Sequence, residues 1–395
     1  MAVQQPQARP PRATSWFNDP VIRGWLYQLV VAAIIIAFIA FVAHNTASNL
    51  AQQNKSTGFD FFFQTSGFDI LFTLIPYGRS SYYWEAFLVG LLNTLLVSAI
   101  GIVFATMLGF TVGIARLSSN WIISRLATVY IETLRNIPLL LQLFFWYFAV
   151  LKAMPGVKNS ILFFDSALNQ RGLFVPRPIV DERFIYVVIA FVVAIVAGLV
   201  LRWWARRRLD STGARFPVVL SFIGILIALP ALAWLVSGTH VEFEVPVVRG
   251  FNYAGGIAIP PELLALALGL ILYTATFIAE TVRAGVQSVS RGQTEAAQAL
   301  GLKEGDRLRL VIIPQAMRVI VPPLTSQYLN LTKNSSLAVA IGYPELVSVF
   351  MGTTLNQTGR AIEVVFITML VYLVISLITS LLMNWYNARV ALVER

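Results

Sequence analysis

The sequence predicts an all-α integral membrane protein with about eight transmembrane helices. Of its 395 residues, 57% are hydrophobic and only 12% are charged, and the mean hydropathy is +0.73. Soluble domains are about 45–50% apolar and about 25% charged. Several charge-free stretches reach about 17 residues or more, which is enough for a helix to cross a hydrocarbon core of roughly 30 Å. Composition and stretch length together exclude a soluble enzyme.

The apolar stretches place the helices along the chain. The first, at 26–42, follows a polar, Pro-rich tail of residues 1–25. It is longer than the apolar core of a signal peptide, about 7–15 residues, and no small-residue cleavage site follows, so we expect a retained helix within the segment 26–85. The remaining stretches are 87–115, 130–151, 184–201, 217–236, 263–283, 319–340 and 364–385.

The distribution of charge predicts the orientation. An even number of crossings puts both termini on one side, and the segments on that side carry twice as many lysines and arginines as the opposite segments. Both termini are therefore expected in the cytoplasm, and the net charge of +10 indicates membrane orientation rather than binding of nucleic acid. Arg206–Arg208 is the strongest local anchor, with a site for membrane lipid head groups as the alternative reading.

The cysteine and histidine content excludes several kinds of chemical site. The chain has no cysteine, which excludes disulfides, zinc–thiolate sites and thiol nucleophiles. Its two histidines, His44 and His240, have no metal-ligand spacing. No metal site is expected.

Four ionisable residues fall within or beside the predicted spans. A charge at the centre of a membrane helix costs about 2.5–3.5 kcal/mol, so such residues usually face protein or a watery path. Glu132 and Arg135 are three residues apart near a helix end, and Glu280 precedes Arg283 by the same spacing. Each pair is a candidate functional site, with a simple interfacial ion pair as the alternative. The fourth residue, Lys333, lies deeper in its span.

Lys333 stands in a run too polar for a lipid-facing helix. With 3.6 residues per turn, Gln327, Asn330 and Asn334 share a face that Lys333 overlaps. One cation with several amides and hydroxyls suits a zwitterionic small molecule, whose carboxylate pairs with the ammonium. The alternative is a helix–helix contact held by hydrogen bonds. Because no acidic residue nearby can pair with the lysine, we favour a substrate site formed by Gln327, Asn330, Lys333, Asn334, Ser335 and Ser336.

The segment from 283 to 318 predicts a cytoplasmic elbow. Residues 294–300 form a short amphipathic helix with Glu295 in its first turn, and Gly301 is the expected helix stop. A second helix begins near Glu304 and ends at Pro314, which disfavours continuation. Two short helices joined by a glycine suit docking into a partner.

This elbow resembles the Glu-Ala-Ala loop of ATP-binding-cassette importer permeases. The resemblance rests on Glu295-Ala296-Ala297, Gly301, Val311 and Ile313-Pro314 at the family spacing, with conservative departures at 311 and 313. Flanking motifs are similar to those of the polar amino acid branch, which transports histidine, glutamine, glutamate or arginine: Arg135-Asn136-Ile137-Pro138 and Lys333-Asn334-Ser335-Ser336-Leu337. The match covers residues 86–151 and 262–385. The block 152–261, with two extra crossings, resembles the long permeases of broad-specificity L-amino acid systems.

The resemblance implies a type I importer permease core built from 86–151 and 262–395, in a bacterial inner membrane. It implies a cytoplasmic ATPase dimer that grips the coupling loop at about 290–314, through Glu295, Ala296, Ala297, Gly301 and Pro314. A second, related permease chain and a periplasmic amino-acid-binding protein complete the complex. ATP and Mg would act in the ATPase, because no glycine precedes any of the five lysines here and a phosphate loop is excluded.

By the same resemblance, Lys333 takes the substrate carboxylate during alternating access. Asn334 and Ser335 stand where the family motif often has Asp and Thr, which favours neutral or acidic substrates, or broad selectivity, over a strictly cationic one. If the partner permease holds the working pocket, Lys333 is structural instead.

Two other classes compete with this reading. An ion-gradient-driven secondary transporter needs paired intramembrane carboxylates or broken helices in repeated halves. A membrane-embedded enzyme needs an assembled catalytic set. The sequence shows neither pattern.

Overall fold

Helices dominate the computed structural model, which describes residues 20–52, 58–214 and 216–390. Within these ranges seven helices are long and apolar enough to cross a membrane, and one bent pair brings the number to eight, which confirms the prediction. The long helices are α1 (Pro20–Gln52), α2 (Tyr83–Arg116), α3 (Trp121–Asn136), α5 (Phe184–Thr212), α6 (Val218–Ser237), α7 (Pro261–Gln287), α10 (Ile313–Asn334) and α12 (Ala361–Val390).

Shorter helical pieces connect them. The α-helical ones are α4 (Leu139–Phe144), α8 (Arg291–Ala299), α9 (Glu304–Arg307) and α11 (Leu355–Thr358). Wide π-helical turns span Phe145–Leu151, Leu308–Ile312 and Val347–Thr354, and tight 3₁₀ turns span Asp60–Phe63, Val157–Asn159 and Ser335–Ile341.

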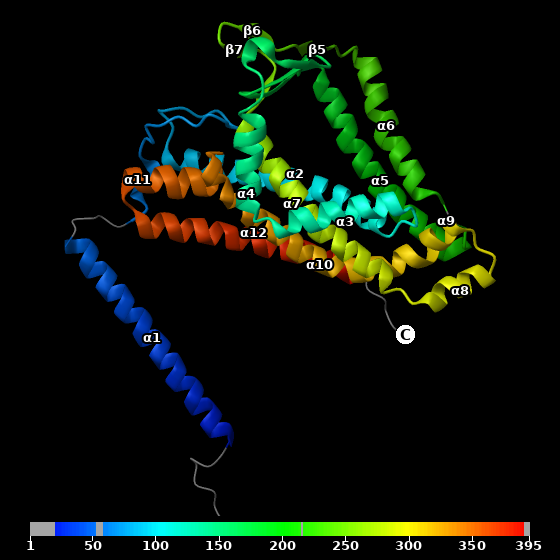
Figure 1. Cartoon of the computed structure of the whole chain (residues 1–395), viewed down its shortest axis with the longest axis horizontal. Coiled ribbons are helices and arrows are strands. Elements are labelled where there is room, and N and C mark those ends of the chain that lie inside the picture. The colour runs from blue at the N-terminus through cyan, green and yellow to red at the C-terminus, as the bar shows by residue number, and fades with distance from the viewer. Residues whose placement is uncertain (1–19, 53–57, 215, 391–395) are drawn as a thin grey trace, which may run out of the picture.

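Helices α2, α7, α10 and α12 form the bundle that contains the core, and α8 and α11 lie at its opposite ends (Figure 1). The backbones of α2 and α7 approach closely because glycines line the contact. A Cβ at Gly109 would lie 2.6 Å from the Cβ of Ile278, and one at Gly113 would lie 2.7 Å from the carbonyl oxygen of Ala279. These glycines are therefore required by the packing.

The span predicted as one helix over 130–151 is instead bent by 105° between α3 and α4. Ile137 is extended (φ −92°, ψ 127°), since the residue before a proline is driven out of the helical region, and Pro138 follows at the break. The side-chain amide of Gln142 donates to the carbonyl oxygens of Leu134 (2.7 Å) and Ile137 (2.9 Å). These bonds satisfy carbonyls that the break leaves without helical partners.

The block 152–261 contains short strands that the all-α prediction did not include. They form a four-stranded antiparallel sheet in the order β1-β2-β3-β8 and two strand pairs, β4–β5 and β6–β7. Their bounds are β1 (Ile161–Phe163), β2 (Ser166–Asn169), β3 (Gly172–Val175), β4 (Arg177–Val180), β5 (Val241–Glu244), β6 (Val247–Arg249), β7 (Asn252–Ala254) and β8 (Ile257–Ile259).

The pairing of β3 with β8 closes the base of this block. Leu173 lies opposite Ile259 in the register, so the chain leaves the bundle and returns to it at one place. Between these strands α5 and α6 form a hairpin that packs on itself, with Phe222 seated on Gly198, where a Cβ would collide with the ring. The hairpin and strands stand away from the bundle in Figure 1.

The segment between the last two spans is held to α12 by a buried carboxylate. Glu345 is fully buried and accepts hydrogen bonds from the backbone amides of Val347 (2.8 Å) and Ser348 (2.7 Å) and from the hydroxyl of Tyr372 (3.1 Å). Burial raises the pKa of Glu345 to about 7, against an ordinary 4.5. The segment lies at the end of the bundle that carries α11 (Figure 1).

Candidate functional site

The coupling loop has the conformation that the sequence predicts at its glycine. Helix α8 begins three residues earlier than expected, at Arg291, and ends at Ala299. Gly301 follows with φ +72°, its amide donating to the carbonyl of Gln298 (2.9 Å), while the amide of Leu302 donates to that of Ala297 (3.1 Å). This pair of bonds is a Schellman motif, which needs a left-handed residue at its centre. The expectation of a helix stop at Gly301 is confirmed.

The prediction that a helix ends at Pro314 is wrong. Helical structure continues from Glu304 to Ile341, and Pro314 occupies the first turn of α10, directly after the π-helical turn Leu308–Ile312. Proline is tolerated at the start of a helix because its missing N–H has no intrahelical role there. The second arm of the elbow is thus continuous with the span that carries the polar face.

Apolar side chains are exposed on this loop. Leu300 is 80% exposed and Leu310 is 62% exposed. Glu295 and Ala296 also face solvent, whereas Ala297 is buried against the rest of the elbow. Exposed leucines beside polar residues are typical of a surface that a protein partner covers.

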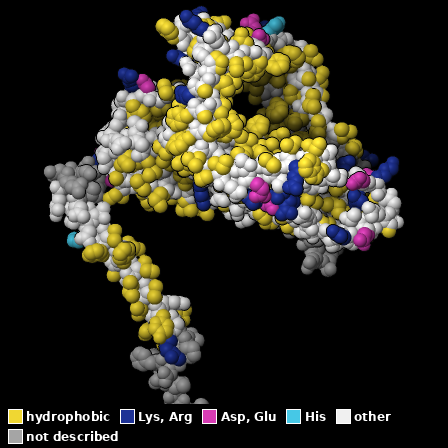
Figure 2. Space-filling model, viewed as in Figure 1, with side chains coloured by type: hydrophobic (Ala, Val, Ile, Leu, Met, Phe, Trp, Pro, Cys, Tyr) yellow, Lys and Arg dark blue, Asp and Glu magenta, His cyan; other side chains and the backbone are white. Residues whose placement is uncertain are grey.

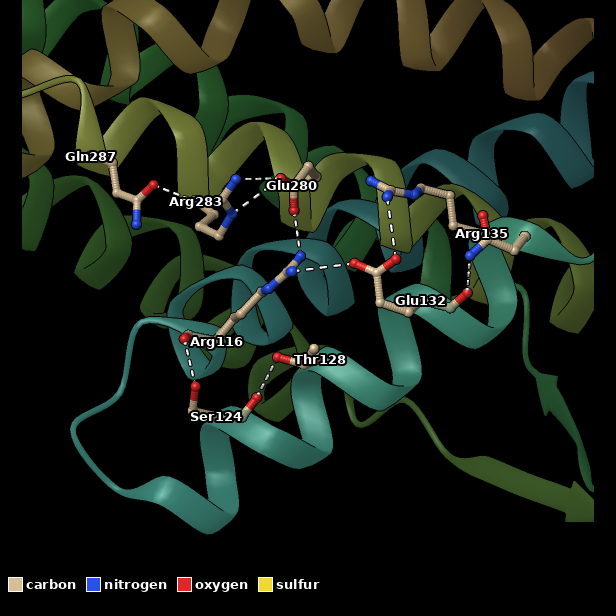
Figure 3. A network of polar contacts seen from close by, with 9 residues as sticks. Arg116, Ser124, Thr128, Glu132, Arg135, Glu280, Arg283 and Gln287 are labelled. Carbon is tan, nitrogen blue, oxygen red and sulfur yellow. Dashed lines mark hydrogen bonds and ion pairs between the residues drawn. The ribbon is translucent and has the colours of Figure 1, made fainter.

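A network of charges joins three helices near this loop (Figure 3). Arg116, the last residue of α2, contacts Glu280 of α7 (2.5 Å) and Glu132 of α3 (3.2 Å). Each carboxylate also pairs within its own helix, Glu132 with Arg135 (3.4 Å) and Glu280 with Arg283 (2.5 Å). The two pairs predicted from sequence are both present. Their connection through Arg116 was not predicted, because it depends on tertiary packing.

The network joins the C-terminal parts of α2, α3 and α7, and α7 leads into the loop. Arg116 is 19% exposed and Glu280 is 29% exposed, so their attraction is screened less than that of a surface pair. Ser124 supports the arginine by donating to the carbonyl oxygen of Arg116 (2.9 Å). Charged contacts between helices can break and re-form as the helices rotate, which is the behaviour a gate needs.

A cleft of about 520 Å³ connects this network to the predicted polar face. Its lining comes from α3, α7 and α10: Arg135, Phe277, Glu280, Thr281, Ala284, Val319, Pro323 and Gln327. One residue of the predicted substrate set, Gln327, thus lies in the same cleft as two charged members of the network.

The other predicted substrate residues fall into two groups. Asn330 and Lys333 are exposed on α10, and Asn334 and Ser336 are half-buried beside them. Lys333 forms no ion pair with any residue of the described ranges. Ser335 is fully buried, and its hydroxyl donates to the carbonyl oxygen of Thr332 (2.7 Å). In this conformation Ser335 does not share the open face.

Comparison with known proteins gives the family. Residues 190–392, half of the chain, match the model of the binding-protein-dependent transport system inner membrane component. The chain belongs to this family. The general L-amino acid transport system permease protein AapQ of Rhizobium johnstonii is 51% identical over 98% of both chains. The putative amino-acid ABC transporter permease protein YhdX of Escherichia coli is 51% identical over 96% of this chain and 97% of its own.

A third relative is more distant. The glutamate/glutamine/aspartate/asparagine transport system permease protein BztB of Rhodobacter capsulatus is 41% identical over 97% of both chains. The family assignment, the permease core and the role as a translocation component rather than an enzyme, all expected from the sequence, are confirmed. The protein is a multi-pass permease subunit of a binding-protein-dependent transporter, and nothing in the comparisons supports a gradient-driven transporter.

Proposed function

We propose that this chain is the permease subunit of an ATP-driven amino acid importer, and that the open face of α10 contacts the substrate. The proposal rests on Lys333. Its ammonium is exposed and has no carboxylate partner among the described residues, and its helix is continuous with the coupling loop. A free amino acid supplies the missing carboxylate. Gln327, Asn330 and Asn334 offer amides to its remaining polar groups. The substrate classes in the names of AapQ and BztB support this choice.

A second permease chain completes the pathway in this proposal. Asn330 and Lys333 are exposed along a membrane-spanning helix, and a lysine facing lipid is costly. A second, related permease on this face removes that cost and encloses the path between the two subunits. Ser336 borders the path, and Ser335 joins it when the segment Ser335–Ile341 rearranges.

Coupling to ATP follows from the elbow. We assign α8, Gly301 and the exposed leucines to contact with a cytoplasmic ATPase dimer. Six spans precede this loop and two follow it, so in this proposal both termini are cytoplasmic as well. ATP and Mg act in that partner. A periplasmic amino-acid-binding protein delivers substrate at the end of the bundle that carries α11. The charge network around Arg116 forms the gate on the cytoplasmic side.

The same proposal divides the chain into functional segments. The permease core is 86–151 with 262–395, the coupling loop is 290–314, and 152–261 is an insertion whose base is the β3–β8 pair. Residues 26–85 supply the first helix and an external loop. Residues 1–19 of the tail lie outside the described residues, and 20–25 belong to the first turns of α1.

The test is uptake by the reconstituted complex. The permease pair, ATPase and binding protein are placed in liposomes, and ATP-dependent uptake of labelled glutamate, glutamine and neutral amino acids is measured. Lys333→Ala should lower uptake at least about tenfold, as expected for loss of a charge-assisted contact. Lys158→Ala, at an exposed lysine of the insertion, is the matched control. Unchanged uptake by a correctly assembled Lys333→Ala complex would rule out the pocket.

A further inference from the structure

The hairpin α5–α6 contains an apolar groove that the transport mechanism does not use. Its volume is about 610 Å³, and it lies between the later turns of α5 and the first turns of α6. Leu199 and Leu209 wall one side, and Phe216, Val219 and Phe222 wall the other. The only charged side chains in its lining are two arginines, Arg202 and Arg206.

These two arginines lack acidic partners. They are one turn apart on the same face of α5, and neither forms an ion pair with any residue in the ranges the structure covers. The next two arginines differ. Arg207 stacks over the ring of Trp203 at 4.0 Å and Arg208 over that of Trp204 at 5.3 Å.

The position of the groove in the membrane follows from connectivity. Successive spans cross in alternate directions, so the α5–α6 turn lies on the same side as the loop between α7 and α10. Under the proposed function this side is cytoplasmic. Arg202 directly follows the apolar stretch 184–201, so it lies at the end of the span, where an arginine side chain reaches the head-group level.

The surroundings of the hairpin also favour lipid. α5 and α6 pack chiefly on each other. Figure 2 shows a hollow between the hairpin and the bundle with hydrophobic side chains around it. In a bilayer, hydrocarbon chains fill such a space.

We propose that this groove binds an anionic phospholipid, with its phosphate on Arg202 and Arg206 and an acyl chain along Leu199, Val219 and Phe222. An occupant must carry both a negative charge for two unpaired guanidiniums and a hydrocarbon part for the apolar walls. A phospholipid supplies both, and guanidinium binds phosphate oxygens in bidentate fashion. The inference uses the proposed function only to name the leaflet.

Binding is tested on the delipidated full complex in detergent, without substrate or ATP, so that failure of the importer proposal leaves the result intact. Dioleoyl phosphatidylglycerol and dioleoyl phosphatidylcholine are titrated separately and bound lipid is counted by native mass spectrometry. We expect a preference of about tenfold or more for phosphatidylglycerol. Arg202→Gln/Arg206→Gln should abolish the preference. Arg207→Gln/Arg208→Gln, which removes equal charge from the same helix end, should keep it.

A second variant tests the contribution of the acyl chain to binding separately from that of the phosphate. Val219→Trp fills the groove and leaves both arginines in place, so it should weaken binding of phosphatidylglycerol. Equal binding of the two lipids, or equal loss in both double variants, overturns the proposal. Complete displacement of phosphatidylglycerol by millimolar inorganic phosphate would show an anion site without lipid, and efficient crosslinking from position 219 to the partner permease would show a protein interface. Either result also overturns it.

Discussion

Substituting two glycines of the coupling loop with alanine should have opposite effects. Gly301 has φ +72°, and no heavy atom lies within 4 Å of the position a Cβ would take. The cost of Gly301→Ala is therefore conformational, about 1–2 kcal/mol for an L-residue held in the left-handed region. Gly292, in the first turn of α8, has no positive φ, and its nearest contact would be the hydroxyl of Ser290 at 4.0 Å. Gly292→Ala should stabilise the loop by about 0.5–1 kcal/mol.

The cost at Gly301 should appear as weaker docking of the ATPase. A docked loop needs the Schellman motif that orients Leu300. A penalty of about 1–2 kcal/mol lowers the equilibrium constant for that conformation about fivefold to thirtyfold, and the affinity falls by up to the same factor. Affinity is measured by titrating isolated ATPase onto the permease in nanodiscs. Gly301→Asn should lose less than Gly301→Ala, because asparagine visits the left-handed region more readily.

The control is Gly292→Ala, which should bind the ATPase at least as well as the parent. Gly305→Ala, in α9 with open space around it, is a second control. Affinity of Gly301→Ala equal to that of the parent, or to that of Gly292→Ala, would refute the argument from backbone conformation.

Three further predictions concern the bundle. In a double-mutant cycle on chemical unfolding, Arg116→Gln and Glu280→Gln should show an interaction energy of about 0.5–3 kcal/mol, and additive effects would contradict the network. Because the pKa of Glu345 is raised, the folded state holds a proton that the unfolded state releases between pH 4.5 and about 7. The free energy of unfolding should therefore fall as pH rises through this range, and melting curves of Glu345→Gln should lack this fall. Gly113→Ala should lower the melting temperature because its Cβ would meet the backbone of α7, whereas Gly224→Ala, with open space, should not; equal melting temperatures would contradict the close packing.

The features predicted from sequence were those set by local rules. Apolar stretches gave the spans, a spacing of three residues gave both ion pairs, and Gly301 marked a helix end. The predictions at Pro138 and at Pro314 were wrong for the same reason. A proline constrains its own φ and its predecessor, but tertiary contacts decide whether the helix breaks, as at Pro138, or continues after a wide turn, as at Pro314.

The polar face was only partly predictable. Extrapolating 3.6 residues per turn places Asn330 and Lys333 on the exposed side of α10, whereas Gln327 is half-buried in the cleft with α3 and α7. Ser335 comes four residues after the fully buried Leu331, so the same helical period puts it on the buried face, and only its place in the family motif had suggested that it joins the open one. The strands of the insertion are three or four residues each, too short to give a reliable alternating pattern.

The β3–β8 pair also bears on the ancestry of long and short permeases. Leu173 and Ile259 face each other in an antiparallel register, so the ends of the intervening stretch are separated by about 5 Å. A connection of about two residues can span such a gap. A single genetic insertion or deletion between these two positions would therefore change the number of crossings by two without rerouting the helices on either side. Because two crossings cancel in direction, every later segment, including the coupling loop, would keep its side of the membrane.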